Sequence, residues 1–227
     1  MSYTIESIAE CIGARRGGEC EATIDWLLTD SRSLSFPEET LFFALTTKRN
    51  SGARYIPDLY DRGVRNFVVT EEDFEKIKNG ELGKLSTLNF LIVTNPLKAL
   101  QKLAEIHREE FKIPIIGITG SNGKTIVKEW LHQLLSPDRR IVRSPRSYNS
   151  QIGVPLSVWQ LNEEAELGIF EAGISEMGEM NALKRMIKPT IGILTNIGGA
   201  HQENFFSLQE KCMEKVTLFK DCDVVIY

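Results

Sequence analysis

The amino-acid sequence predicts an α/β protein with two successive units, each built on a largely parallel sheet. Three observations predict this. Short apolar runs rich in β-branched and aromatic residues alternate with segments of helical periodicity. A turn-favouring pair, Asn95–Pro96, separates two such series. A glycine-rich turn near residue 120 joins an apolar run to a helical one.

The first series contains three short apolar runs bounded by polar or turn residues. These runs, 40–45, 66–69 and 89–94, are typical of buried strands. Residues 53–63 favour a helix that ends at a glycine, which completes a strand–helix–strand rhythm. The apolar spacing after Pro96 predicts a further helix, through about residue 111. We therefore expect a first domain over residues 1–96.

The second series begins with a continuous apolar run typical of a central parallel strand. The expected order is strand 112–119, helix 125–136, strand 167–173, strand 190–199 and helix 207–219. The residues expected to face inward are Ile126, Val127, Trp130, Leu131, Leu134 and Leu135 on the first helix and Leu208, Cys212, Val216 and Phe219 on the second. The last six residues read as a strand with nothing after it, so we expect residues 97–227 to be an incomplete domain.

Composition and charge exclude several classes of protein. The net charge of −4 does not favour nucleic-acid binding, which usually comes with a basic face. No apolar run approaches the roughly 20 residues that span a bilayer, and the first residues lack the apolar core of a signal peptide. The four cysteines form no CxxC pair, which argues against a zinc cage or a disulfide framework. We expect a cytoplasmic protein.

The segment Gly117–Trp130, GITGSNGKTIVKEW, has the order of a phosphate-binding loop: strand, glycine turn, Lys-Thr, helix. Main-chain N–H groups of such a turn form a concave nest, and the helix N-terminus adds partial positive charge. Lys124 would neutralise phosphate oxygens, and Thr125 would place a hydroxyl on Mg²⁺. Ile118 stands where the common GxxxxGK[ST] pattern has its first glycine. The alternative is an ordinary turn followed by a surface lysine.

The residues TGSNGKT at 119–125 closely resemble the phosphate loop of the Mur ligases, which build the peptide of bacterial cell-wall precursors. TDSR at 29–32, followed by LFFAL, resembles the start of that family's nucleotide-sugar-binding domain. Three further segments resemble the member that adds D-alanyl-D-alanine: 148–158, 170–180 and 195–207. These motifs follow in order over nearly the whole chain.

The resemblance implies a domain plan and a reaction. Residues 1–96 would bind the UDP-substrate, and residues 97–227 would be the central ATP-binding domain, with the family's third domain absent. The reaction would join D-alanyl-D-alanine to UDP-N-acetylmuramoyl-tripeptide through an acyl phosphate, with ATP and Mg²⁺. We expect the chain alone to bind without turnover. The loop and Tyr148–Gln151 resemble the form that is fused to an alanine racemase in some bacteria.

The resemblance also implies roles for single residues. Lys124 would neutralise the phosphates, Glu171 and His201 would bind Mg²⁺, and Lys215 would become a further metal ligand by carbamylation. Glu171 follows an apolar run, where strand ends line a ligand crevice. The alternatives are a capping glutamate, a satisfied loop histidine and a solvated helix lysine. His107 and His132 are expected to be structural.

The remaining assignments concern binding. Thr125, Glu171, His201 and Lys215 make up the expected metal set. The expected nucleotide contacts are Thr119, Gly120, Ser121, Asn122, Gly123, Lys124, Thr125 and Asn196. The expected UDP-substrate contacts are Ser31, Arg32, Thr47, Asn149, Ser150 and Gln151, with Lys48 and Asn50 as possible helpers. For the polar residues at 149–151, capping of the loop is the alternative.

Other functions stay open at this point. Ile126 stands where most members of the family have threonine. A folylpolyglutamate synthase-like ligase shares the superfamily but lacks a separate UDP-binding domain. A generic P-loop NTPase or kinase should carry an aspartate after a strand, where this chain has Glu171. A non-catalytic binding module would differ from a ligase by turnover alone.

Overall fold

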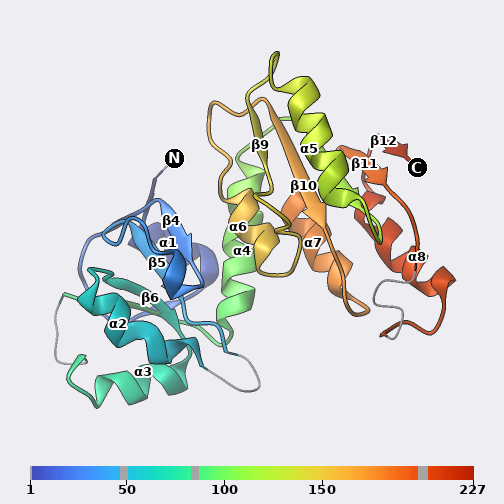
Figure 1. Cartoon of the computed structure of the whole chain (residues 1–227). Helices are drawn as coiled ribbons and strands as arrows, with labels where there is room; N and C mark the ends of the chain where they lie inside the picture. The colour runs from blue at the N-terminus through green and yellow to red at the C-terminus, as the bar shows by residue number, and fades with distance from the viewer. Residues whose placement is uncertain (1, 47–50, 83–86, 199–203) are drawn as a thin grey trace. The chain divides into compact units, whose positions relative to one another are not determined.

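The computed structural model describes residues 2–46, 51–82, 87–198 and 204–227. The chain divides into two compact units, Met1–Leu103 and Ala104–Tyr227 (Figure 1). The division falls within helix α4 (Pro96–Glu109), a few residues after the predicted boundary. The roles given to residues 1–96 and 97–227 stay predictions. Over the described ranges, no helix has both the length and the apolar character needed to cross a membrane.

The first unit contains a five-stranded sheet in the order β2-β7-β6-β5-β4. Four strands run parallel and β2 pairs antiparallel with β7. The strands are β2 (Arg15–Arg16), β4 (Trp26–Leu28), β5 (Thr40–Phe43), β6 (Asn66–Val69) and β7 (Asn89–Ile92). All residues of β5, β6 and β7 are buried, which explains why these three strands were readable as apolar runs.

Helices and a small ribbon complete this unit. The predicted helix after residue 53 forms as a 3₁₀ turn, η2 (Gly52–Tyr55), followed by α2 (Ile56–Asp61). The other elements are β1 (Tyr3–Thr4) and β3 (Thr23–Ile24), which pair antiparallel, with α1 (Ile5–Ile12), η1 (Ser31–Ser33) and α3 (Glu71–Lys78). Phe42, Phe67 and Phe90 form the aromatic centre of the core.

The second unit is a five-stranded, fully parallel sheet in the order β12-β11-β8-β10-β9. The strands are β8 (Ile115–Thr119), β9 (Ile141–Arg143), β10 (Leu167–Ala172), β11 (Ile191–Leu194) and β12 (Val224–Ile226). The helical elements are α5 (Lys124–Leu135), α6 (Gly153–Val158), α7 (Glu179–Ile187), α8 (Leu208–Val216) and η5 (Thr217–Phe219). The parallel sheet confirms the predicted fold class. Because the central strand β8 lies between β10 and β11, the segments that follow these three strands meet at one sheet edge.

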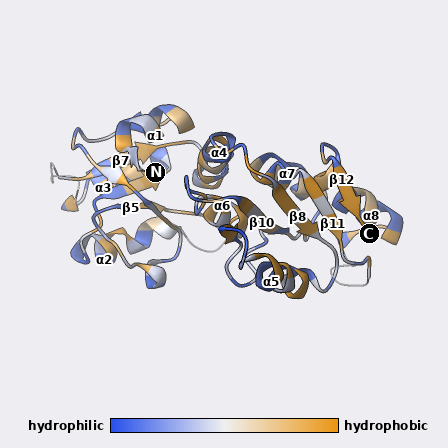
Figure 2. Cartoon of the chain, turned by 90° about the horizontal axis from the view of Figure 1, so that it is seen from above, coloured by the Kyte–Doolittle hydropathy of each residue, from blue (hydrophilic) through white to orange (hydrophobic). Residues whose placement is uncertain are grey.

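Two apolar clusters hold the sheet of the second unit. The larger packs Phe170 against side chains of α6, α7 and η5, among them Val158, Leu183 and Leu218. The smaller joins Ile116, Ile118 and Ile169 to α5 on the opposite face. Figure 2 shows β8 and β10 coloured as hydrophobic, as expected for strands covered on both faces.

The predicted inward face of α5 is half wrong. Val127, Leu131 and Leu135 pack against the sheet as expected. In contrast, Ile126, Trp130 and Leu134 are 57%, 63% and 72% exposed. Each of these lies one residue before a half-buried position that packs against the sheet, which is about 100° around a helix. The six apolar residues therefore span too wide an arc to face one sheet.

The predicted inward face of α8 is only partly right. Phe219, just beyond the helix, is buried and the half-buried Val216 packs against the same core, as expected. In contrast, Leu208 is 52% exposed and Cys212 is half-buried. The buried residues of α8 are charged: Lys211, Glu214 and Lys215. The spacing of apolar residues does not predict the buried side of this helix, because α8 turns these charged side chains toward the protein. The charged side chains bind main-chain groups there.

Candidate active site

The glycine-rich turn joins the end of β8 to the start of α5. Thr119 is buried, and its hydroxyl donates to the carbonyl of Ala172 on β10 at 2.8 Å. Gly120 and Gly123 have φ angles of 147° and 82°, in the region that favours glycine. No side chain caps α5 at Gly123. The first N–H groups of α5 lack acceptors within the helix, so the turn offers donors and a partial positive charge to an anion.

Asn196, after β11, is hydrogen-bonded to this turn. Its carbonyl accepts from the N–H of Ser121 at 2.9 Å, and its Oδ1 accepts from the N–H of Asn122 at 3.0 Å. The neighbouring Thr195 hydroxyl donates to the carbonyl of Asn122 at 2.6 Å. Two N–H groups of the expected anion nest are therefore occupied by Asn196. The contacts of Asn196 are with the turn, whereas the sequence predicted an approach to the nucleotide.

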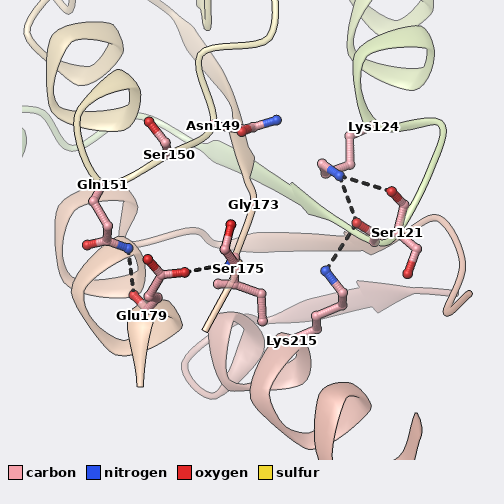
Figure 3. Close-up of a pocket in the computed structure, with 11 residues that line it drawn as sticks. Ser121, Lys124, Asn149, Ser150, Gln151, Gly173, Ser175, Glu179 and Lys215 are labelled. Carbon is pink, nitrogen blue, oxygen red and sulfur yellow. Dashed lines mark hydrogen bonds between the residues drawn. The ribbon is translucent and has the colours of Figure 1, made fainter. Parts of the chain in front are cut away.

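Three buried or half-buried lysines converge behind the turn. Lys124 and Lys215 donate to the carbonyl of Gly120 at 2.8 Å and 3.2 Å, as Figure 3 shows. Lys211 Nζ donates to the carbonyl of Gly198 at 2.5 Å. Burial, and then repulsion from Lys124 and Lys211, lowers the pKa of Lys215 to about 8. Burial also lowers the pKa of Lys124, against a smaller opposing effect of Glu171.

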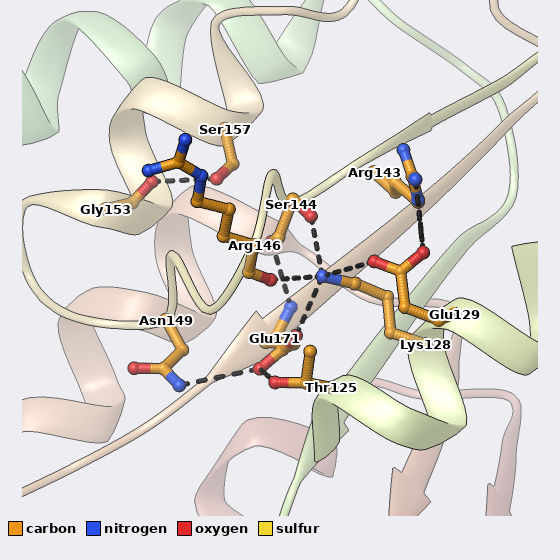
Figure 4. Close-up of polar contacts among 10 residues, drawn as sticks. All are labelled: Thr125, Lys128, Glu129, Arg143, Ser144, Arg146, Asn149, Gly153, Ser157 and Glu171. Carbon is orange, nitrogen blue, oxygen red and sulfur yellow. Dashed lines mark hydrogen bonds and ion pairs between the residues drawn. The ribbon is translucent and has the colours of Figure 1, made fainter.

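Glu171, on β10, is fully buried beside the start of α5. Its Oε2 accepts from the Thr125 hydroxyl at 3.0 Å and lies 3.5 Å from Asn149 Nδ2. Its Oε1 faces the ammonium of Lys128 at 3.0 Å. This Oε1 has the distance of an ion pair but makes no hydrogen bond among the described residues. Figure 4 shows the carboxylate between Thr125 and Lys128. The fold thus brings together Thr125 and Glu171, two of the predicted metal ligands.

The chemistry of these groups suits Mg²⁺. A hydroxyl and a carboxylate are the oxygen ligands that Mg²⁺ prefers, and it commonly takes one or two carboxylates plus waters and substrate phosphates. Accordingly, the described residues contain no cluster of three or more His, Cys, Asp or Glu side chains. Lys215 donates to a carbonyl here, and as an ammonium it has no lone pair to offer a metal. His201 lies outside the described residues.

A cavity of about 130 Å³ opens beside the glycine turn. Its remaining walls come from the segments after β10 and before α6 and from one residue each of α7 and α8 (Figure 3). The lining residues are Gly120, Ser121, Lys124, Asn149, Ser150, Gln151, Gly173, Ile174, Ser175, Glu179 and Lys215. Lys124 and Lys215 therefore line the same cavity as the three polar residues predicted at 149–151.

Those three residues have different contacts. The carbonyl of Asn149 accepts from the N–H of Gly173 at 2.8 Å, which ties the loop to the end of β10. Ser150 Oγ accepts from the N–H of Gly153 at 3.2 Å, which is the loop-capping role named as the alternative. Gln151 Nε2 donates to the carbonyl of Glu179 at 3.0 Å. Asn149 alone of the three has a contact with Glu171 among those described.

The residues predicted for the uridine diphosphate end belong to the first unit. The Arg32 side chain is 87% exposed and pairs with Asp30 at 2.6 Å. The hydrogen bonds of Arg32 hold the pKa of the Asp30 carboxyl below its usual value. Ser31 begins η1, and its carbonyl accepts from Arg62 at 2.8 Å. Thr47, with its neighbours Lys48 and Asn50, lies outside the described residues.

Sequence reasoning missed three polar residues at this edge of the sheet. Lys128 is fully buried against Glu171. Ser144, after β9, accepts from the N–H of Glu171 at 3.2 Å. Glu179 Oε2 accepts from the N–H groups of Ser175 and Glu176 at 2.6 and 3.0 Å. The available signal was position: Lys128 follows Thr125 by one helical turn, Ser144 comes directly after β9, and Glu179 is the first residue of α7.

Comparison with known proteins bears on this site. Residues 118–226 match a family model described as the Mur ligase middle domain. The chain is 36% identical over 198 residues to a Borreliella burgdorferi protein and 30% identical over 232 residues to a Bacillus subtilis protein. Both relatives are named UDP-N-acetylmuramoyl-tripeptide–D-alanyl-D-alanine ligase. The chain belongs to the Mur ligase family.

The shared length and the solved structures extend this result. The matches include 86% and 100% of this Mur ligase chain, but only 42% and 49% of the two relatives. A structure of MurF from Acinetobacter baumannii superposes on this chain with a TM-score of 0.84 at 22% identity, which supports the fold. The superposition covers 98% of this chain and 47% of the MurF chain. MurF from Thermotoga maritima in complex with ADP superposes on 87% of the chain and 43% of its own, with a TM-score of 0.69 at 25% identity.

Proposed function

We propose that this Mur ligase chain supplies the UDP-substrate-binding and ATP-binding parts of an ATP-dependent ligase. That ligase adds D-alanyl-D-alanine to UDP-N-acetylmuramoyl-tripeptide. One observation carries the proposal for the second unit. The Thr125 hydroxyl and the Glu171 carboxylate meet at 3.0 Å, next to the glycine turn that carries Lys124. This is an oxygen pair suited to Mg²⁺ beside donors suited to phosphate.

The reaction needs such a site because a carboxylate resists attack by an amine. Transfer of the γ-phosphoryl group of ATP to the tripeptide carboxylate forms an acyl phosphate and releases ADP. The amine of D-alanyl-D-alanine then attacks the acyl carbon, the amide bond forms, and phosphate leaves with the electron pair of the broken C–O bond. The protein contributes mainly positioning and neutralisation of negative charge. Lys124 and the first N–H groups of α5 are the groups proposed for that work.

Thr125 and Glu171 would hold Mg²⁺, which neutralises phosphate charge when bound. His201 and Lys215 complete the proposed metal set. Carbamylation of Lys215 joins its neutral amine to CO₂ with loss of one proton and creates an anionic oxygen ligand. A pKa near 8, against an ordinary value of 10.5, raises the fraction of that neutral amine near physiological pH. The buried position of Lys215 behind Gly120 therefore supports the proposal.

The substrate contacts are proposals of the same kind. Asn149, Ser150 and Gln151 line the cavity beside Lys124. In the first unit, the proposed contacts are Ser31, Arg32 and Thr47. The chain spans less than half the length of the two relatives, so turnover is proposed for the whole ligase and ligand binding for this chain. The fused alanine racemase and the cytoplasmic location stay predictions.

Calorimetric titration of the chain tests the proposal. Wild type is titrated first with UDP-N-acetylmuramoyl-tripeptide and then with ATP and Mg²⁺, and Lys124→Ala follows. We expect both ligands to bind wild type, and ATP binding to fall at least tenfold in the variant. The matched control is Lys188→Ala, since this half-exposed lysine pairs with Glu109. ATP binding without UDP-tripeptide binding would favour a folate-type ligase or a generic NTPase. Binding of neither would overturn the proposal.

A further inference from the structure

Lys128 is a fully buried lysine that the proposed reaction does not use. It lies on α5 one turn after Thr125, and its side chain has no exposed area. Its ammonium lies 3.0 Å from Glu171 Oε1 and 3.1 Å from Glu129 Oε1. It also donates to the carbonyls of Ser144, at 2.8 Å, and Arg146. Figure 4 shows these contacts converging on one nitrogen.

These contacts connect three parts of the site. Lys128 belongs to the helix of the phosphate loop, Glu171 to β10, and Ser144 to the segment after β9. That segment continues to Asn149, which returns to Glu171 Oε2 at 3.5 Å. One ammonium thus holds both the carboxylate and the start of the loop that lines the cavity.

The backbone at Arg146 provides an independent observation. Its φ angle is 49°, which residues other than glycine rarely adopt. Such a conformation persists where surrounding contacts hold it, and it is common at functional sites. The carbonyl of Arg146 is one of the oxygens bound by Lys128. The strained residue lies three positions before Asn149.

The two oxygens of Glu171 face different partners. Lys128 occupies the side of Oε1, while Oε2 is turned to the Thr125 hydroxyl at 3.0 Å. The Lys128 ammonium therefore pairs with Oε1 and leaves Oε2 to the Thr125 hydroxyl. Without Lys128, the buried carboxylate would lose the ion pair that the described residues give it and the contact that holds Oε1.

We propose that Lys128 is a positioning residue that turns Glu171 Oε2 toward the Mg²⁺ position and fixes the loop carrying Asn149. The inference rests on the proposed function, because it assigns Glu171 to the metal. Lys128 is fully buried and does not line the cavity beside the glycine turn, so we assign it no direct contact with nucleotide or metal. Replacing Lys128 should therefore reduce the gain in ATP affinity that Mg²⁺ produces. The affinity for ATP without metal should stay the same.

The test measures the dissociation constant of ATP by calorimetry on the chain, once with EDTA and once with saturating Mg²⁺. The ratio of the two constants is the coupling between metal and nucleotide. For Lys128→Gln, which keeps a donor but removes the charge, we expect the coupling to fall at least fivefold. The metal-free constant should change less than twofold. General loosening of the fold would weaken both constants alike.

Two further variants keep the result decisive. Glu129→Gln removes the partly exposed carboxylate on the other side of Lys128 and should leave the coupling unchanged. Lys128→Arg keeps the charge, but a planar guanidinium cannot reproduce contacts arranged around one nitrogen, so the coupling should fall at least twofold. The arginine variant decides the matter if the glutamine variant does not fold.

The outcomes separate the two proposals. Wild-type coupling in a folded Lys128 variant, or tighter Mg²⁺-dependent binding, would overturn the positioning role and leave the ligase proposal standing. An equal loss with EDTA and with Mg²⁺ would also overturn it, in favour of a purely structural role. If wild type bound no ATP with either additive, the proposed function and this inference would fall together.

Discussion

Lys124 and Lys215 donate to the same oxygen, the carbonyl of Gly120, at 2.8 Å and 3.2 Å. One lysine comes from the start of α5 and the other from the end of α8. The fold therefore holds two amines close together in a place with little water. Burial and mutual repulsion disfavour the charged form, which is why the pKa of Lys215 falls to about 8.

The first prediction follows from that pKa. The pKa of Lys215 is about 8 in the folded chain against 10.5 for the ordinary value. Between those two values the unfolded chain binds more protons, so the free energy of unfolding should rise with pH. The full effect is about 3 kcal/mol. Denaturant unfolding of wild type and Lys215→Met at pH 7, 8.5 and 10, in CO₂-free buffer, measures it.

The difference between wild type and Lys215→Met should move in favour of wild type as the pH rises. The half-exposed Lys188 provides the control, because Lys188→Met should show no such trend. A difference that stays constant from pH 7 to pH 10 would contradict the low pKa of Lys215.

The second prediction compares two glycines with positive φ. A Cβ on Gly120 would lie 2.0 Å from Thr195 Oγ1, whereas one on Gly178 would meet no atom within 4 Å. Gly178→Ala should therefore cost about 1 kcal/mol, for the backbone conformation alone. Gly120→Ala should cost roughly 3 kcal/mol or more, because a clash is added. It should also abolish ATP binding. Equal losses of stability, measured by denaturant unfolding, would show that the contact with Thr195 can relax.

The third prediction concerns Asn196, which is hydrogen-bonded to the glycine-rich turn. Asn196→Ala removes the Oδ1 that accepts from the N–H of Asn122. We expect ATP affinity to fall about three- to tenfold, which corresponds to the roughly 1 kcal/mol of one hydrogen bond. Asn162→Ala removes a similar side-chain acceptor, for Glu164 N–H, in an exposed loop, and should leave ATP binding unchanged. Tighter ATP binding by Asn196→Ala would indicate that Asn196 competes with phosphate for the N–H groups.

The fourth prediction concerns His107, which packs between Phe111 and Trp159. Burial lowers its pKa from 6.5 to about 4, although its Nε2 lies 3.0 Å from the carbonyl of Leu161. Below pH 6.5 the unfolded chain takes up the proton first, so wild type should lose up to about 3 kcal/mol as the pH falls to 4. His107→Gln should lose less over that range, by denaturant unfolding. An unchanged pH dependence would mean that His107 is not the group responsible.

Much of the fold could be predicted because the buried strands are apolar throughout. Every residue of β5, β6, β8 and β10 is buried, so each strand stood out as an apolar run between polar turns. Helix faces were harder. On α5, Trp130 and Leu131 are adjacent in sequence, yet only Leu131 packs against the sheet. Apolar residues indicate a helix that packs, but neighbouring elements decide which side is covered.

The candidate site also contains features that the sequence predicted and features that it did not. The order of Gly120, Gly123, Lys124 and Thr125 by itself determined a phosphate-loop geometry, because the backbone angles and the helix start are local properties. The partners of those residues were decided only by the tertiary structure. Lys128 looked like any lysine on a helix, and only the family resemblance distinguished Lys215 from the other lysines nearby. Folding places Lys128 against Glu171 and Lys215 against Gly120, because parallel strands bring segments distant in the chain to one sheet edge. A charged side chain becomes informative only when the groups that surround it are known.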